Sequence, residues 1–256
     1  MSDVLVLCYH AVSTTWSASL SVAPDRMDWQ LQTLLRRGYR ATTFFDAVTQ
    51  PPAPRTLAVT FDDAYRSVRE IAFPLLSRLG VPATVFVPTR FPGSTDPMAW
   101  PGIEHWLEGP HEGELRCMTW DDIAQLDRAG WEIGSHTHAH LRLPSLDDSA
   151  LAFELRTSSQ ICAERLRKPC RSLAYPFGEY DARVVLAARD AGYEAAATLP
   201  SRLGRPARLA WPRVGVYHED GATVFRAKVS PTMRRLRSLP GWAVVNTTRS
   251  LVQPRP

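Results

Sequence analysis

Residues 57–63 of this 256-residue chain read Leu-Ala-Val-Thr-Phe-Asp-Asp. The first five residues form a largely apolar run that is typical of a buried strand, and Asp62 and Asp63 follow at its end. In parallel α/β barrels, active sites are built at the carboxyl ends of the strands. Two adjacent carboxylates repel each other, so a positive group is expected nearby, and a metal ion is the simplest one. The alternative is a turn or helix cap made by the two side chains.

A strand-then-helix rhythm continues on both sides of this stretch and predicts a parallel α/β architecture in a single domain. Several of the amphipathic segments end at a glycine, as at Gly38, Gly80 and Gly192. Seven or so such units favour a barrel over an open sheet, and such a barrel commonly fills about 250 residues. We expect strands at residues 4–9, 39–45, 57–61, 83–87, 131–134, 172–175, 193–198 and 211–216, and helices at 24–37, 67–79, 120–129, 146–166 (capped by Ser145) and 181–191.

The composition is that of a globular protein, because 45% of the residues are hydrophobic, which excludes disordered and low-complexity classes. The chain has 30 basic and 26 acidic residues, but seven of the basic residues and none of the acids follow Asp220. Residues 1–220 therefore carry a net charge of −3 and the remainder +7. We expect residues 1–220 to form the barrel and residues 221–256 a basic C-terminal extension, a helix followed by a frayed tail.

The start of the chain and its four cysteines predict a cytoplasmic protein. Residues 1–10 lack the basic and long apolar regions of an export signal. The cysteines include no CxxC pair and suggest reduced thiols rather than a disulfide framework. The basic extension mixes apolar residues with arginines, so peripheral contact with the inner face of a membrane is one expectation and a helix packed on the barrel is the other. No motif indicates nucleic-acid binding.

A second set of reactive side chains, Gly134-Ser-His-Thr-His-Ala-His140, follows the strand expected at residues 131–134. Three histidines in five residues are hard to explain as core packing, and neutral imidazole is the commonest nitrogen ligand of zinc. Two of these imidazoles and one carboxylate, on separate strand ends, would form a metal site with open positions for water and substrate.

Two further segments carry weaker signals. Residues 173–180 run from a strand into a Pro-Phe-Gly turn, which can present backbone N–H groups and an aromatic wall, although alone it indicates only a turn. Residues 88–119 show little periodicity, and a loop this long is usually functional or mobile. Its aromatic and histidine side chains either line a substrate groove or pin the loop to the barrel: Trp100, His105, Trp106 and His111.

In this order, the segments resemble the motifs of the polysaccharide deacetylases, the NodB-homology group of carbohydrate esterase family 4. The family's TFDDG motif is present here as Thr60-Phe-Asp-Asp-Ala64, and its HTxxH motif as residues 136–140. Its RxPYG motif is present in part at residues 174–178. The resemblance covers residues 4–218 and implies a distorted (β/α)7 barrel, a TIM-like fold of the NodB type.

The resemblance also implies a reaction, the hydrolysis of an acetamide on a sugar nitrogen in an N-acetylglucosamine-type polysaccharide or its precursor. Asp62 would be the general base that takes a proton from water. A divalent metal, most simply Zn²⁺ with Co²⁺ or Ni²⁺ as alternatives, would be held by Asp63, His136 and His140. His138 has no role in the family, although His136 and His138, at strand spacing, are an alternative ligand pair.

The sequence departs from the family's pattern in its third motif and near its end. The arginine that steadies the catalytic aspartate is replaced by Ala174, and residues 211–213, Trp-Pro-Arg, offer an aromatic wall and a substitute arginine. The general acid that protonates the leaving amine is either His218 or His10. The candidates for contact with the substrate or its oxyanion are Pro176, Phe177 (through its backbone N–H), Gly178, Trp211 and Arg213.

Two other functions stay open at this point. A related amidohydrolase of the same fold would cleave a small non-peptide C–N bond in a closed pocket, whereas a wide groove with exposed aromatic residues would favour a glycan. A catalytically weak glycan-binding module, suggested by the missing arginine, would bind sugar without releasing acetate.

Overall fold

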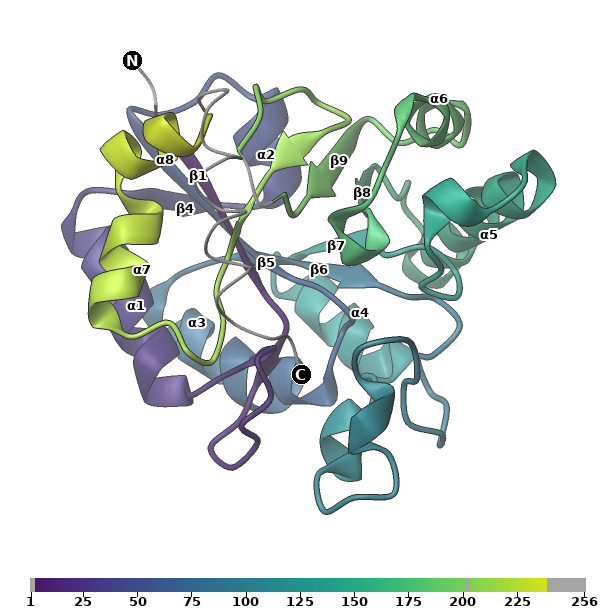
Figure 1. Ribbon diagram of the computed structural model, residues 1–256, viewed down its shortest axis with the longest axis horizontal. Helices are drawn as coiled ribbons and strands as arrows, with labels where there is room; N and C mark the ends of the chain where they lie inside the picture. The colour runs from purple at the N-terminus through teal and green to yellow at the C-terminus, as the bar shows by residue number, and fades with distance from the viewer. Residues whose placement is uncertain (1–2, 201–202, 239–256) are drawn as a thin grey trace, which may run out of the picture.

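Strands β1 (Asp3–Tyr9) and β5 (Arg55–Phe61) lie side by side at the centre of the computed structural model, which describes residues 3–200 and 203–238. Both strands are buried over nearly their whole length, as expected for parallel strands covered on both faces (Figure 1). The strands predicted at residues 4–9 and 57–61 are therefore confirmed, and the Asp pair lies directly after β5.

The paired strands of the main sheet are all parallel, in the order β10–β9–β8–β7–β6–β5–β1–β11, with β4 beside the first half of β5. The ends of this order, β10 and β11, are separated in the chain by Arg213 alone. The two ends of the sheet are thus adjacent in the chain, so the sheet curves round into a nearly closed barrel. The predicted single-domain barrel is confirmed. The remaining strands are β2 (Ala11–Val12), β3 (Ser21–Val22), β4 (Arg40–Thr42), β6 (Ala83–Val87), β7 (Glu132–Ser135), β8 (Ser172–Ala174), β9 (Ala195–Thr198), β10 (Trp211–Pro212) and β11 (Val214–Gly215).

Helices follow the strands and surround the sheet (Figure 1). The sequence sets their ends locally: Thr119 and Asp122 form a reciprocal capping box at the start of α4. No helix among the described residues is long and apolar enough to cross a membrane. The helices are α1 (Pro24–Arg36), α2 (Phe44–Thr49), α3 (Phe73–Leu79, preceded by a π-turn at Val68–Ala72), α4 (Trp120–Arg128), α5 (Asp148–Leu166), α6 (Ala182–Asp190), α7 (Ala222–Val229) and α8 (Pro231–Ser238).

Some sequence-based boundaries were wrong. The strand expected at residues 39–45 ends at Thr42, because the Thr43 hydroxyl accepts from the backbone N–H of Asp46 and starts α2. The long helix α5 begins after Asp147, whose carboxylate caps the Ala150 N–H at 2.8 Å, rather than after Ser145. The strand expected at residues 211–216 is split at Arg213.

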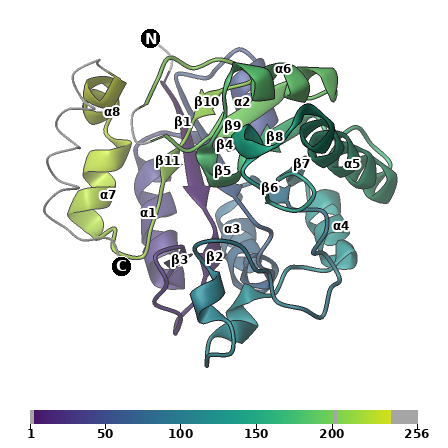
Figure 2. The ribbon, with the colours of Figure 1, turned by 45° about the vertical axis from the view of Figure 1, so that its right-hand side comes forward.

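The first part of the C-terminal extension packs on the barrel as α7, beside α1 (Figure 2), and α8, whose Arg234 pairs with Asp3 at the start of β1. Phe225 of α7 is buried, and its ring lies 5.9 Å from that of Trp29 in α1. Pro231 separates the two helices where the sequence predicted one. The division of the chain at residue 220 remains a prediction, and the predicted frayed tail lies outside the described residues.

Candidate active site

Asp62 is held at the end of β5 by a buried ion pair with Arg213. The two nitrogens of the guanidinium donate to the two carboxylate oxygens at 2.6 and 2.7 Å, and Arg213 also donates to the Thr60 hydroxyl at 2.9 Å. Asp62 is 3% exposed and Arg213 1%. Burial alone would raise the pKa of Asp62, but the Arg213 guanidinium, together with His136 and His10, outweighs it and holds that pKa well below its usual range. Asp62 is therefore a carboxylate, fixed in orientation.

Asp63, His136 and His140 meet beside Asp62 and are all buried. The Nε2 atoms of His136 and His140 each lie 3.3 Å from Oδ1 of Asp63, and this oxygen accepts no hydrogen bond from any described residue. The Nδ1 of His136 lies 2.8 Å from the Ala174 carbonyl oxygen, which can only accept, so Nδ1 carries a proton and Nε2 is the nitrogen that faces Asp63. Burial lowers the pKa of His140 to about 3, which keeps its imidazole neutral.

This donor set fits a divalent metal. A buried carboxylate oxygen without a partner and two imidazoles that present Nε2 are the ligands that zinc prefers. His138 is directed elsewhere, since its Nδ1 lies 3.1 Å from the Thr89 hydroxyl and its ring packs on Phe153. The alternative pairing of His136 with His138 is therefore not the one that the structure brings together.

Glu154 of α5 anchors the loop that carries the histidines. Its Oε2 accepts from the backbone N–H groups of His138 and Ala139 at 3.0 and 2.8 Å, and the side chain is buried. Thr137 and His140, on either side of these amides, both have left-handed φ angles of 66° and 58°. Such angles cost free energy for non-glycine residues and persist only where neighbours enforce them. Sequence reasoning missed this carboxylate, because nothing in an amphipathic helix marks it as a loop anchor.

The Pro176-Phe-Gly178 turn lies beside His140. Phe177 has a φ of 58°, and its ring packs edge-on against His140 at 4.8 Å. Gly178 has a φ of 70°, and a β-carbon there would lie 2.8 Å from the Leu199 backbone nitrogen, so only glycine fits. Phe177 and Gly178 line the pocket described next, whereas Pro176 is buried and does not line it.

A cavity of about 320 Å³ opens onto these groups and is lined by Asp62, Asp63, His136 and His140. His10, at the end of β1, also lines it, and its buried Nδ1 has no hydrogen-bond partner among the described residues. Burial lowers the pKa of His10. Tyr217 lines the same cavity and was missed from the sequence, because its neighbour His218 was the residue of catalytic type.

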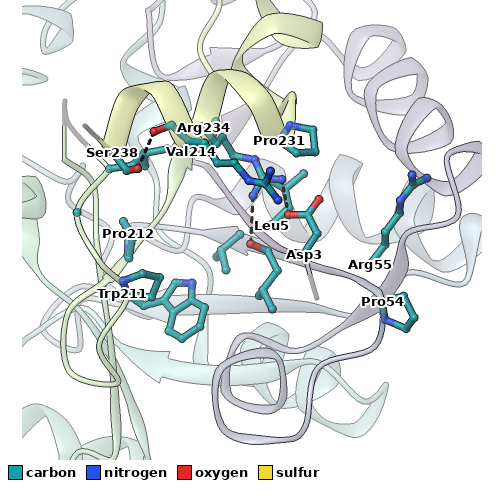
Figure 3. A pocket seen from close by; sticks show the side chains of 16 residues that line it. Asp3, Leu5, Pro54, Arg55, Trp211, Pro212, Val214, Pro231, Arg234 and Ser238 are labelled. Carbon is teal, nitrogen blue, oxygen red and sulfur yellow. Dashed lines mark hydrogen bonds and ion pairs between the residues drawn. The ribbon is translucent and has the colours of Figure 1, made fainter. Parts of the chain in front are cut away.

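Two predicted site residues lie away from this cavity. The Nδ1 of His218 instead contacts the Ser21 carbonyl at 3.2 Å. Trp211 lies at the start of β10, where it lines a different cavity of about 460 Å³ at the amino-terminal ends of the strands with Asp3 and Arg234 (Figure 3). Trp211 is therefore not an aromatic wall of the site, which lies at the carboxyl ends of the strands. Arg213 was predicted either to contact substrate or to substitute for the missing arginine, and its burial against Asp62 agrees with the second role.

The loop of residues 88–119 divides between the two predicted roles. Trp100 stacks on His140 with ring centroids 4.0 Å apart and lines the cavity. Trp106 instead packs on Trp16 at 5.7 Å and pins the loop to the barrel, with His105 and His111 against it. A groove of about 470 Å³ continues past Trp100 and shares Pro101, His140 and Phe177 with the cavity.

Comparison with known proteins gives one consistent result. The family described as polysaccharide deacetylase matches residues 49–196. YxkH of Bacillus subtilis (strain 168) is 25% identical over 198 residues, which cover 75% of this chain and 63% of YxkH. The poly-β-1,6-N-acetyl-D-glucosamine N-deacetylase of Staphylococcus aureus (strain N315) is 24% identical over 132 residues, 48% of this chain and 41% of that protein. The chain thus spans less than two thirds of the length of either relative.

Solved structures show the same fold. The Streptococcus pyogenes deacetylase PplD, in complex with acetate, has a TM-score of 0.73 and 20% identity, and the match covers 90% of this chain and 99% of PplD. IcaB from Ammonifex degensii has a TM-score of 0.71 and 23% identity, with 90% and 97% covered.

The family match covers more than half of the chain and includes the Asp pair, the histidine segment and the Pro-Phe-Gly turn. His10 and Arg213 lie outside it, yet the nearly closed barrel brings both to the same end of β5. With its motifs assembled in this way, the chain belongs to the polysaccharide deacetylase family.

Proposed function

We propose that this chain is a metal-dependent hydrolase that removes N-acetyl groups from an amino-sugar glycan. The observation that carries the proposal is the arrangement at the end of β5, where an ionised Asp62 lies beside a buried Asp-His-His set. Membership of the polysaccharide deacetylase family and the name of the Staphylococcus aureus relative support an N-acetylglucosamine-type substrate.

Asp63, His136 and His140 would hold the metal, with Zn²⁺ first and Co²⁺ or Ni²⁺ as alternatives. A divalent ion supplies a Lewis acid that polarises the acetyl carbonyl and makes a water nucleophilic near neutral pH. Asp62 then accepts the proton of the attacking water. The ion pair with Arg213 fixes the orientation of this carboxylate and keeps it unprotonated at neutral pH.

Two other groups complete the hydrolysis. The backbone N–H of Phe177 has no partner in the described part of the chain, so it is available to the oxygen that becomes negatively charged. His10 lines the cavity and His218 does not, so His10 is the candidate that passes to the leaving amine the proton that Asp62 accepts from the water. The C–N bond breaks, and acetate and a free amino sugar are the products.

The groove beside the cavity favours a glycan over a small molecule. It has about 470 Å³ of space next to the 320 Å³ of the cavity, and Phe91, Trp100 and Phe177 contribute aromatic rings to its lining. Aromatic surfaces of this kind suit the apolar faces of sugar rings. A closed pocket would have favoured the small-molecule amidohydrolase.

The test is acetate release from N-acetylglucosamine oligomers by the purified protein, after chelation and again after Zn²⁺ or Co²⁺ is restored. We expect release only with metal, and none from Asp62→Asn even when that variant binds metal normally. Oligomer binding without release by the metal-loaded protein would instead identify a glycan-binding module.

A further inference from the structure

Tyr217 lies in the catalytic cavity, and its phenol group rests directly on Gly215. A β-carbon at Gly215 would lie 2.6 Å from the Tyr217 hydroxyl oxygen, so this approach is open only to glycine. The hydroxyl makes no hydrogen bond to any residue in the described ranges. It is not among the fully buried side-chain atoms that lack a partner, so part of its surface is accessible. Burial raises the pKa of Tyr217 above its ordinary value, so the group remains an O–H donor.

Lys228 of α7 holds Tyr217 from the C-terminal extension. Its ammonium nitrogen lies 4.7 Å from the centre of the Tyr217 ring and donates to the Gly215 carbonyl at 3.2 Å. It also donates at 2.6 Å to Oδ2 of Asp220, the same oxygen that accepts the Tyr217 backbone N–H at 3.0 Å. Asp220 is only 5% exposed. One cation therefore fixes both the backbone and the ring of a cavity residue.

These contacts do not belong to the groups already assigned to the reaction. Tyr217 lines the cavity but not the groove beyond Trp100, so it bounds the site of the reacting sugar rather than the path of a longer chain. A rigid aromatic side chain with one unused donor is the kind of group that orients a polar ligand.

We propose that Tyr217 binds the N-acetylated sugar, donating a hydrogen bond from its hydroxyl to a sugar oxygen, and that Lys228 positions it for this contact. The proposal rests on the proposed function of the cavity. It makes α7 part of the site, although α7 follows the residue where the sequence places the end of the barrel.

The first experiment compares wild type with Tyr217→Phe, which removes only the hydroxyl. We expect KM for an N-acetylglucosamine oligomer to rise about five- to tenfold, the loss expected for one hydrogen bond, with kcat nearly unchanged. Calorimetry with the same oligomer should show the same loss in Kd. An unchanged KM and Kd in a variant whose parent releases acetate would overturn the proposal while leaving the proposed function intact.

The second experiment tests Lys228 with Lys228→Met, which keeps an unbranched apolar side chain. We expect KM to rise as in Tyr217→Phe, and the double variant to be no worse than the single ones, because Lys228 acts through Tyr217. Arg226→Met is the matched control, since Arg226 lies on the same helix over the ring of Trp29, away from the cavity. Equal effects of the two helix variants would assign Lys228 to stability alone.

A parent protein that binds the oligomer but releases no acetate would contradict the proposed function, and the Kd of Tyr217→Phe would still decide the role of Tyr217. A parent that does not bind the oligomer overturns both.

Discussion

At the scale of single residues, the site depends on an arginine that comes from a different segment of the chain than the one in the family's motif. Ala174 stands where that motif has its arginine, and Arg213 reaches Asp62 from the junction of β10 and β11. The guanidinium lies 5.4 Å from the centre of the Phe86 ring, in the core cluster that includes Ala174. A small residue at position 174 is compatible with the passage of the Arg213 side chain through this part of the core.

We expect Arg213→Met to destabilise the protein by about 3–5 kcal/mol, because it leaves the Asp62 carboxylate buried without its partner. Urea denaturation measures this loss. In the double variant Asp62→Asn/Arg213→Met, part of the stability should return, since no charge is left uncompensated. If the loss of unfolding free energy in the double variant equals the sum of the losses in the two single variants, the unpaired charge is not what destabilises Arg213→Met.

Glu132 gives the protein a pH dependence that does not involve the metal candidates. Its carboxylate accepts from the Phe45 N–H and the Thr84 hydroxyl, both at 2.8 Å, and from the Ser172 hydroxyl. Burial raises the pKa of Glu132, and these donors offset it only in part. The folded state therefore keeps the proton of the Glu132 carboxyl group to a higher pH than the unfolded chain does.

As the pH rises from about 4, the ordinary range of a glutamate, the unfolded chain loses its proton first, which favours unfolding. We expect the free energy of unfolding to decrease through this range until the folded pKa is passed. Glu132→Gln should lack this decrease. Denaturation curves of both proteins at several pH values measure it, and a constant offset between them would contradict the assignment.

At the scale of elements, α5 holds the histidine loop in its conformation as much as β7 does. Glu154 accepts two successive loop amides, and Ser158, one turn later, contacts the Ser135 hydroxyl at 2.5 Å. We expect Glu154→Ala to weaken Zn²⁺ binding about 10- to 100-fold, as for other residues that orient ligands.

Glu154→Gln should retain most of the affinity for Zn²⁺, because its amide oxygen can still accept. Competition with a chromophoric chelator measures the affinity directly. The control is Glu164→Ala, an exposed position on the same helix. If Glu154→Ala binds Zn²⁺ as tightly as the control, the loop holds its shape without α5.

The elements also show where prediction from sequence succeeds. The strands and the Asp and His segments could be predicted, because burial and ligand chemistry leave periodic or local signals. The cavity position of Tyr217 and the contacts of Glu154 with the histidine loop could not, since each depends on contacts between distant segments. Trp211 was misplaced because β10 and β11, read as one strand, lie at the two ends of the sheet order, with Arg213 at the turn between them.

At the scale of the whole molecule, the metal candidates connect separate parts of the barrel. Asp63 follows β5, whereas His136 and His140 follow β7, with β6 between these two strands. The unfolded chain does not hold these groups together, so a metal bound to them should stabilise the folded barrel by mass action.

With Zn²⁺ at about 100 times its Kd, the gain is about 2.7 kcal/mol, which raises the Tm of a protein of this size by about 5–10 °C. Thermal unfolding with chelator and then with Zn²⁺ measures the shift. Asp63→Asn should lose it, because the buried oxygen that both imidazoles face is then a weaker ligand. His138→Ala should retain the full shift, since His138 contacts Thr89 and Phe153 rather than the other two histidines. If His138→Ala loses the shift and His140→Ala keeps it, the ligand pair is His136 with His138, and the loop must rearrange when metal binds.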